Sequence, residues 1–132
     1  MPATAPVTIT EYVWPRAVPE WLGGGGTLAL YAVGIASRWA VPGSSLHALL
    51  ERSFPGGADT FVWIAHNVVF WLAAAHAVEV LLFDSLRLRR HGVPRWSALW
   101  WKWELSVFIE GIGAWGRIGK VIQEKQALLK SK

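Results

Sequence analysis

The chain contains no cysteine and few charged residues, which make up 17% of its 132 positions. Without a thiol, disulfide bonds, thiolate catalysis and thiolate metal sites are all excluded. Soluble domains carry about 25% charged residues, so the low share is typical of a chain in lipid. The apolar share is 53%, and ten residues are tryptophan. Because tryptophan concentrates at membrane–water interfaces, the composition predicts an integral membrane protein.

A positively charged N-terminus is also missing, since Arg16 is the first basic residue. A cleavable secretory signal requires a positive start before its apolar run, and a transit peptide is rich in arginine. We therefore expect the first membrane segment to act as its own signal. The net charge is +4, but the basic residues stand at the ends of apolar runs rather than on one stripe. This distribution predicts the lipid bilayer as a partner and argues against nucleic acid.

The four histidines lack the spacing of a metal site. No two of them are four positions apart, as a helical zinc site requires. His66 and His76 lie in one apolar run, whereas two histidines that bind haem must face each other from different helices. We expect no metal and no other cofactor.

Three apolar runs predict an all-α fold, an integral membrane bundle of about three transmembrane helices. The runs cover residues 21–41, 61–83 and 96–118. The second is the strongest, because its roughly 23 residues exceed the roughly 20 that a bilayer core requires. The first and third contain small residues at helical spacing, which let another helix approach closely. In the first run this partly small face consists of Gly26, Leu30, Val33, Gly34 and Ser37. In the third run we expect Gly113 and Gly116 to lie against a neighbouring helix.

The segments beside these runs complete the predicted organisation. Residues 1–20 contain four prolines and little periodicity, which indicates an extended tail or a segment that approaches the membrane interface. Residues 21–122 are expected to form the transmembrane helical domain, and residues 123–132 a charged tail. In the first connection, Ser45 is a suitable N-cap for a short amphipathic helix in the membrane interface. The basic residues are divided five against seven between the two sides of a three-span chain, so the orientation stays open.

Polar residues inside the apolar runs are the candidates for chemistry, because an ionisable group at membrane depth costs roughly 2.5–3.5 kcal/mol. His76 and Glu79 are three positions apart and share one helical face. Such a pair can exchange a proton, as general acid–base catalysis requires. Glu110 shares a helical stripe with Trp103, and a carboxylate beside an indole suits a cation or a carbocation-like transition state. The predicted catalytic residues are therefore His76, Glu79 and Glu110, and the predicted substrate-binding residues are Trp103, Trp71, Asn67 and Glu104.

Each of these residues also has a structural interpretation. The predicted His–Glu pair can be a hydrogen-bonded link between helices. Glu110 can form an ion pair with Lys102, Arg117 or a histidine of another helix. Lys102 and Glu104 lie near the start of the third run and can reach the membrane interface. The tryptophans of that run are more typical of an interfacial belt than of an aromatic cage.

Three short patterns follow one another between residues 46 and 122. They are W-x4-H-x2-E at Trp71, His76 and Glu79, the basic turn RRHG at residues 89–92, and the run WWKWELSVFIEG. Together they resemble a small eukaryotic family of three-helix membrane proteins whose human member is called transmembrane protein 254. The resemblance implies a helical membrane fold in an endomembrane, such as the endoplasmic reticulum, and no particular activity. The family tends to have an uncharged amide where this chain has Glu104, a departure that would fit a specialised function.

Two functions are consistent with these patterns. The first is an accessory or assembly partner that docks onto another membrane protein or a second copy of itself. The alternative is a membrane-embedded acid–base enzyme, an isomerase or cyclase of sterol, terpenoid or other lipid metabolism, which would bind an apolar lipid or terpenoid. Membrane sterol isomerases resemble the chain in chemistry alone, since they too bury histidine, glutamate and tryptophan in a helical bundle. The sequence favours the first function.

Overall fold

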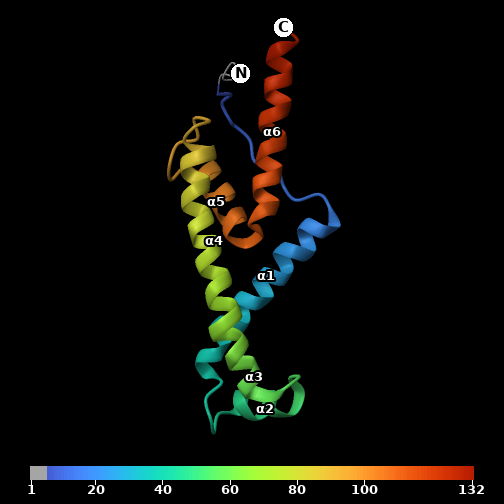
Figure 1. Cartoon of the computed structure of the whole chain (residues 1–132), viewed down its shortest axis with the longest axis vertical. Helices are drawn as coiled ribbons and strands as arrows, with labels where there is room; N and C mark the ends of the chain where they lie inside the picture. Colours follow the sequence, from blue (N-terminus) through green and yellow to red (C-terminus); the bar gives the residue numbers. More distant parts are fainter. Residues whose placement is uncertain (1–5) are drawn as a thin grey trace. The chain divides into compact units, whose positions relative to one another are not determined.

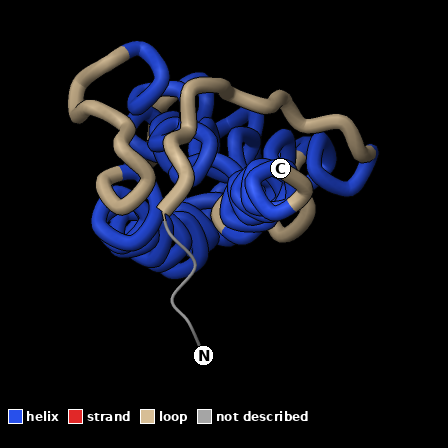
Figure 2. The backbone as a smooth tube through the Cα atoms, turned by 90° about the horizontal axis from the view of Figure 1, so that it is seen from above, coloured by secondary structure: helices blue, strands red, loops and turns tan. Residues whose placement is uncertain are grey.

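The computed structural model describes residues 6–132, and within this range every regular element is a helix (Figure 1, Figure 2). The predicted all-α class is confirmed. Residues 1–5 of the predicted tail lie outside the described residues. The helices are α1 (Val18–Ala36), η1 (Ser37–Trp39), α2 (Ser45–Ser53), α3 (Gly57–Trp63), η2 (Ile64–Val69), α4 (Phe70–Phe83), η3 (Asp84–Leu88), α5 (Ala98–Glu110) and α6 (Ile112–Lys130).

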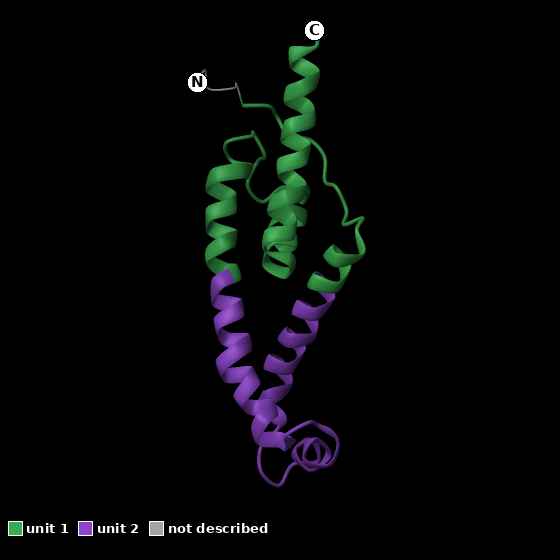
Figure 3. Cartoon of the chain, turned by 45° about the vertical axis from the view of Figure 1, so that its right-hand side comes forward, with its two compact units in different colours: residues 1–23, 76–132 green, residues 24–75 purple. Residues whose placement is uncertain are grey.

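The chain divides into two compact units, which are coloured separately in Figure 3. Unit 1 consists of Met1–Gly23 and His76–Lys132, and unit 2 consists of Gly24–Ala75. The candidate site described below lies in unit 1.

Unit 2 contains the short helix that was expected between the first two apolar runs. This helix, α2, begins one residue after Ser44, whose hydroxyl oxygen accepts a hydrogen bond from the His47 amide at 3.0 Å. The N-cap is therefore Ser44 rather than the predicted Ser45. Leu50 of α2 is buried in an apolar cluster with Ala58 and other residues. Packing of this apolar face, more than intrinsic propensity, stabilises so short a helix.

One continuous helix, formed by α3, η2, α4 and η3, covers Gly57–Leu88 and has 32 residues. Within the described part of the chain, it is the single helix that is long and apolar enough to cross a membrane. Only 17% of its most apolar window is buried, whereas the core helix of a soluble protein would be mostly covered. We call this helix the candidate span. It supports a membrane location, but the predicted bundle of three spans is not confirmed.

The third apolar run does not form the single membrane helix that was predicted for residues 96–118. Helix α5 ends at Glu110, and α6 begins at Ile112. Between them Gly111 has φ +57° and ψ −117°, a backbone conformation that is accessible almost only to glycine. This residue ends α5, so that α6 packs against it. The predicted charged tail, residues 123–132, is mostly the end of α6.

Among the described residues, the small face of the first run makes a close contact at Gly34 but not at Gly26, and the contacts predicted for Gly113 and Gly116 are not found. A Cβ atom built on Gly34 would lie 2.7 Å from a methyl carbon of Val69, so α1 and η2 approach each other closely there. A Cβ atom on Gly116 would meet nothing within 4 Å, and one on Gly113 would meet only Glu110. The helix contact of α6 instead uses Ala114 and Ile118, which are fully buried.

The N-terminal segment, residues 6–17, is extended and is part of the core of unit 1 (Figure 1). Residues 18–20, which were expected to belong to the tail, are the start of α1. Val7 and Ile9 are buried at 5% and 1% exposure, while Thr8 and Thr10 between them are exposed. The Ile9 amide donates a hydrogen bond to the His91 carbonyl at 2.9 Å. This segment therefore contributes two apolar side chains to the buried cluster of unit 1.

Candidate functional site

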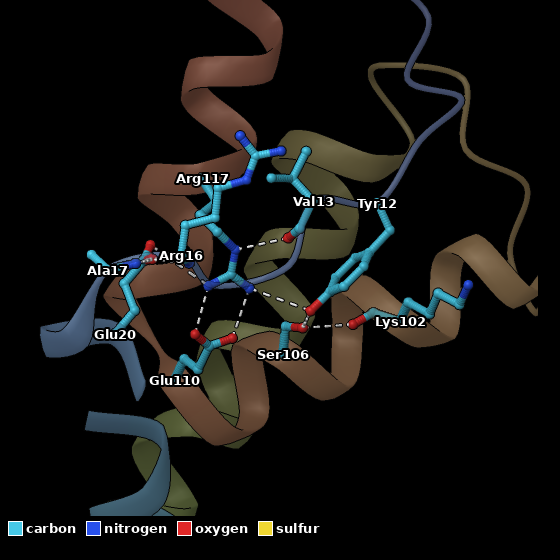
Figure 4. A network of polar contacts seen from close by, with 9 residues as sticks. All are labelled: Tyr12, Val13, Arg16, Ala17, Glu20, Lys102, Ser106, Glu110 and Arg117. Carbon is cyan, nitrogen blue, oxygen red and sulfur yellow. Dashed lines mark hydrogen bonds and ion pairs between the residues drawn. The ribbon is translucent and has the colours of Figure 1, made fainter. Parts of the chain in front are cut away.

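Arg117 of α6 is the centre of a buried polar network in unit 1 (Figure 4). Its guanidinium donates two hydrogen bonds to the Glu110 carboxylate, at 2.5 and 2.7 Å, one to each oxygen. The two side chains are only 5% and 8% exposed. This parallel pair of hydrogen bonds is the strongest arrangement that arginine and a carboxylate form. The sequence had offered Lys102, Arg117 or a histidine as partners of Glu110, and the partner in the structure is Arg117.

The break at Gly111 makes this pair possible. In an uninterrupted α-helix, residues seven positions apart are separated by about 10 Å along the axis. Because α6 packs against α5 beyond Gly111, Glu110 and Arg117 meet across the bend. Glycine at position 111 is therefore a structural requirement of the Arg117 network.

The remaining donors of Arg117 bind the N-terminal segment. Its Nε donates to the Val13 carbonyl at 3.0 Å, and a terminal nitrogen donates to the Tyr12 hydroxyl at 3.4 Å. The Glu20 carboxylate lies 3.8 Å from the guanidinium. Burial alone would lower the pKa of Arg117, but hydrogen bonds and charge from Glu110 outweigh it, and the pKa is raised. The guanidinium thus stays charged and holds the segment to α6.

His76 and Glu79, the predicted acid–base pair, both point to the bend at Gly111. A Cβ atom built on Gly111 would lie 2.9 Å from His76 Nε2 and 2.9 Å from Glu79 Oε2, so the two side chains are neighbours. His76 Nδ1 lies 2.7 Å from the Phe108 carbonyl; because a carbonyl only accepts, this nitrogen carries the proton. Within residues 6–132, the buried Oε2 of Glu79 has no hydrogen-bond partner.

The predicted substrate-binding residues are divided between the two units. Trp71 and Asn67 belong to unit 2, and both are exposed; the Asn67 amide donates to the Trp63 carbonyl of its own helix at 3.0 Å. Trp103 and Glu104 belong to unit 1.

Trp103 is a core residue that anchors the N-terminal segment. It is fully buried, and its indole N–H donates to the Glu11 carbonyl at 3.2 Å. Its ring packs edge-on against Tyr12, with centroids 4.9 Å apart. Its one donor is therefore already used within the fold.

Glu104 lies near the start of the third run, a position from which it was expected to reach the membrane interface. In the structure it is instead buried, at 3% exposure. Within the described residues, neither of its carboxylate oxygens has a hydrogen-bond partner. Burial raises the pKa of Glu104 to about 7, and the charge of Asp84 adds to this effect while Arg95 opposes it. Glu104 is consequently a buried carboxyl group that titrates near neutral pH.

We expect Glu104 to make the stability of the protein fall as the pH rises. Between pH 4.5 and about 7 the folded state keeps a proton that the unfolded state releases, so the stabilisation is complete below pH 4.5 and is lost above about 7. A shift of this size corresponds to about 3 kcal/mol. Urea unfolding in detergent micelles, followed by tryptophan fluorescence at several pH values, measures it.

Glu104→Gln should remove this part of the pH dependence, because the amide does not titrate. The matched control is Glu124→Gln on the exposed side of α6. If Glu104→Gln has the same pH dependence as the wild type, Glu104 does not hold the proton.

Sequence reasoning missed a further buried carboxylate, that of Asp84, which directly follows the second apolar run. It accepts hydrogen bonds from Arg95 and, at 2.8 Å, from the indole N–H of Trp100. Asp84 is buried, at 7% exposure. Its hydrogen bonds connect the end of the candidate span to the start of α5. An aspartate directly after an apolar helix, followed by arginine and tryptophan, is the signal that indicates such a network.

A cavity of about 240 Å³ lies beside Arg117. Its lining includes charges of both signs, from Arg16, Glu20, Lys120 and Glu124. None of the three predicted catalytic residues lines this cavity. This cavity is therefore not an active site that contains His76, Glu79 and Glu110 together.

Comparison of the chain with known proteins found no match. No family model matches the chain. Neither a curated protein nor a solved structure matches it.

Proposed function

We propose that the protein is a small membrane accessory or assembly protein of an endomembrane, with the endoplasmic reticulum as its expected location. The observation that carries this proposal is the saturation of Glu110 by Arg117. A catalytic carboxylate must be free to receive or release a proton, whereas a carboxylate in a two-bond ion pair mainly stabilises the fold. Membership of the three-helix family that the chain resembles is part of the same proposal.

The candidate span supplies the surface for such a role. Trp63, Phe70 and Trp71 are 59%, 60% and 67% exposed. Aromatic side chains of this size contribute most to binding energy when a partner covers them. The expected partner is another helical membrane protein or a second copy of this chain, with lipid covering the remaining apolar surface.

The test is photo-crosslinking in native membranes. With p-benzoylphenylalanine in place of Trp71, we expect one or a few protein adducts of defined mass on denaturing gels. The matched control places the same group at Phe83, which is fully buried and should form no adduct between chains. Adducts with lipid alone at Trp71 would contradict the accessory function.

A second candidate function is favoured by one observation. The buried Oε2 of Glu79 has no hydrogen-bond partner within residues 6–132 and lies beside His76 at Gly111. An isomerase or cyclase that acts on a sterol, a terpenoid or another apolar lipid would use such a carboxylate as its acid or base. The absence of protein adducts in the crosslinking experiment would favour this alternative.

A further inference from the structure

A second cavity in unit 1, of about 310 Å³, is lined by basic and amide side chains. It lies between the end of the candidate span and α6, and its lining includes Arg87, Arg90, His91, Gly119, Gln123 and Gln126. No carboxylate is among the lining residues. Its volume is near the lower end of the roughly 300–1,000 Å³ that is usual for small-molecule sites.

Arg87 lines this cavity, and no ion pair of its guanidinium is found in the part of the chain that the structure describes. Its guanidinium lies over the Trp115 ring, 5.6 Å from the centroid. Within residues 6–132 its Nε is buried and has no hydrogen-bond partner. Burying a charged donor without an acceptor is costly, and an anion in the cavity would supply the missing acceptor.

The other lining groups have the chemistry to bind the same anion. Arg90 is exposed and forms no ion pair within the described residues. The side-chain amides of Gln123 and Gln126 are further donors. His91 Nδ1 lies 2.8 Å from the Val7 carbonyl, a contact that fixes the orientation of its ring at the cavity wall.

We propose that this cavity binds a phosphate group. Two arginines provide planar forks of donors that match phosphate oxygens. Leu86 and Arg87 belong to the last turn of the candidate span, which is the level of lipid headgroups if the span crosses a bilayer. The phosphate could therefore come from a phospholipid headgroup or from solution. The proposal does not depend on the accessory function.

The experiment titrates the purified, detergent-solubilised full chain with three probes and measures binding by calorimetry. The probes are dioctanoyl phosphatidic acid, dioctanoyl phosphatidylcholine and inorganic phosphate. We expect phosphatidic acid to bind more tightly than phosphatidylcholine, because its phosphate is a monoester with greater charge. If inorganic phosphate binds as tightly as phosphatidic acid, the ligand is a soluble phosphate; if phosphatidic acid binds more tightly, it is a lipid headgroup. Failure of all three probes to bind would overturn the proposal.

Matched variants separate the cavity from the general basic charge around it. Arg87→Gln and Arg90→Gln should each weaken phosphate binding by about tenfold or more, since each removes charge-assisted hydrogen bonds. Arg89→Gln removes an equal charge from an exposed position that does not line the cavity and should have little effect. Equal losses in all three variants would show attraction to the arginine cluster alone and would contradict the site.

A second pair of variants tests the cavity by its volume. A Cβ atom on Gly119 would meet nothing within 4 Å, so Gly119→Leu can fill the cavity without a change of charge. Gly116 is equally open but does not line it, and Gly116→Leu is the control. Binding should be lost in Gly119→Leu and retained in Gly116→Leu. Retention of binding in a folded Gly119→Leu variant would overturn the proposal.

Discussion

Replacing Arg117 by methionine is expected to lower the free energy of unfolding by about 3–5 kcal/mol, the cost of leaving one buried ion of a pair without its partner. Glu110 would lose both of its hydrogen bonds to arginine, and the Val13 carbonyl would lose the Nε donor. Urea titration in detergent micelles, followed by tryptophan fluorescence, gives the difference.

Lys125→Met is the matched control for the Arg117 variant. Lys125 also binds the N-terminal segment, through the Thr8 carbonyl at 3.1 Å and the exposed Glu11 carboxylate at 3.5 Å. Because this contact is largely exposed to solvent, its loss should cost about 1 kcal/mol or less. The double variant Arg117→Met with Glu110→Gln should recover part of the loss, since it removes the unpaired charge. An Arg117→Met variant as stable as Lys125→Met would contradict a structural role for the network.

Gly111→Ala is expected to destabilise unit 1 by about 3 kcal/mol or more. One cause is backbone strain, because a residue with a Cβ atom rarely adopts φ +57° with ψ −117°. The other is steric, because the new atom would lie 2.9 Å from both His76 Nε2 and Glu79 Oε2. Thermal unfolding in the same detergent measures the combined loss.

Gly116→Ala provides the comparison for this glycine. Gly116 lies within α6, and its Cβ atom would meet nothing within 4 Å. In a helix interior, alanine is favoured over glycine by about 0.5–1 kcal/mol, so this variant should be more stable than the wild type. If both variants shift stability in the same direction, the backbone at Gly111 is not the constraint that the structure indicates.

The difference between these two glycines shows what could be predicted from the sequence. The apolar runs predicted helices, and the second run lies within the candidate span. The bend at Gly111 could not be predicted, because four glycines lie between positions 111 and 119 and the sequence alone does not distinguish Gly111 from the other three. Only the packing of α4 against the bend distinguishes Gly111, and this packing joins residues far apart in the chain.

The candidate site could also be predicted only in part from the sequence. His76 and Glu79 share a helical face, as their spacing predicts, and the structure places them together at Gly111. Arg117 was one of three possible partners of Glu110, and the choice depended on the bend. The N-terminal segment offered an unused signal, the alternation of apolar and polar residues over Val7–Thr10. Its four prolines had instead indicated an unpacked tail.

Contact between the two ends of the chain also restricts how it can be threaded through a bilayer. Thr8 and Val13 bind Lys125 and Arg117 of α6. Two segments that meet outside a bilayer lie on the same side of it, so the chain between them crosses an even number of times. If the candidate span crosses and these contacts lie outside the bilayer, a second crossing is required elsewhere between residues 14 and 116. Helix α1 has 19 residues, which extend over about 28 Å, close to the thickness of the hydrocarbon core.

An even number of crossings changes the distribution of charge between the two sides. The loop between α1 and the candidate span, residues 37–56, contains two basic residues, Arg38 and Arg52. The other eleven of the thirteen lysines and arginines belong to the parts of the chain on the opposite side. If α1 and the candidate span both cross, the positive-inside rule predicts that this side faces the cytoplasm. If both helices cross, the contacts that hold the N-terminal segment to α6 restrict the topology, and we expect this segment and α6 on the cytoplasmic side and the loop that carries α2 on the opposite side.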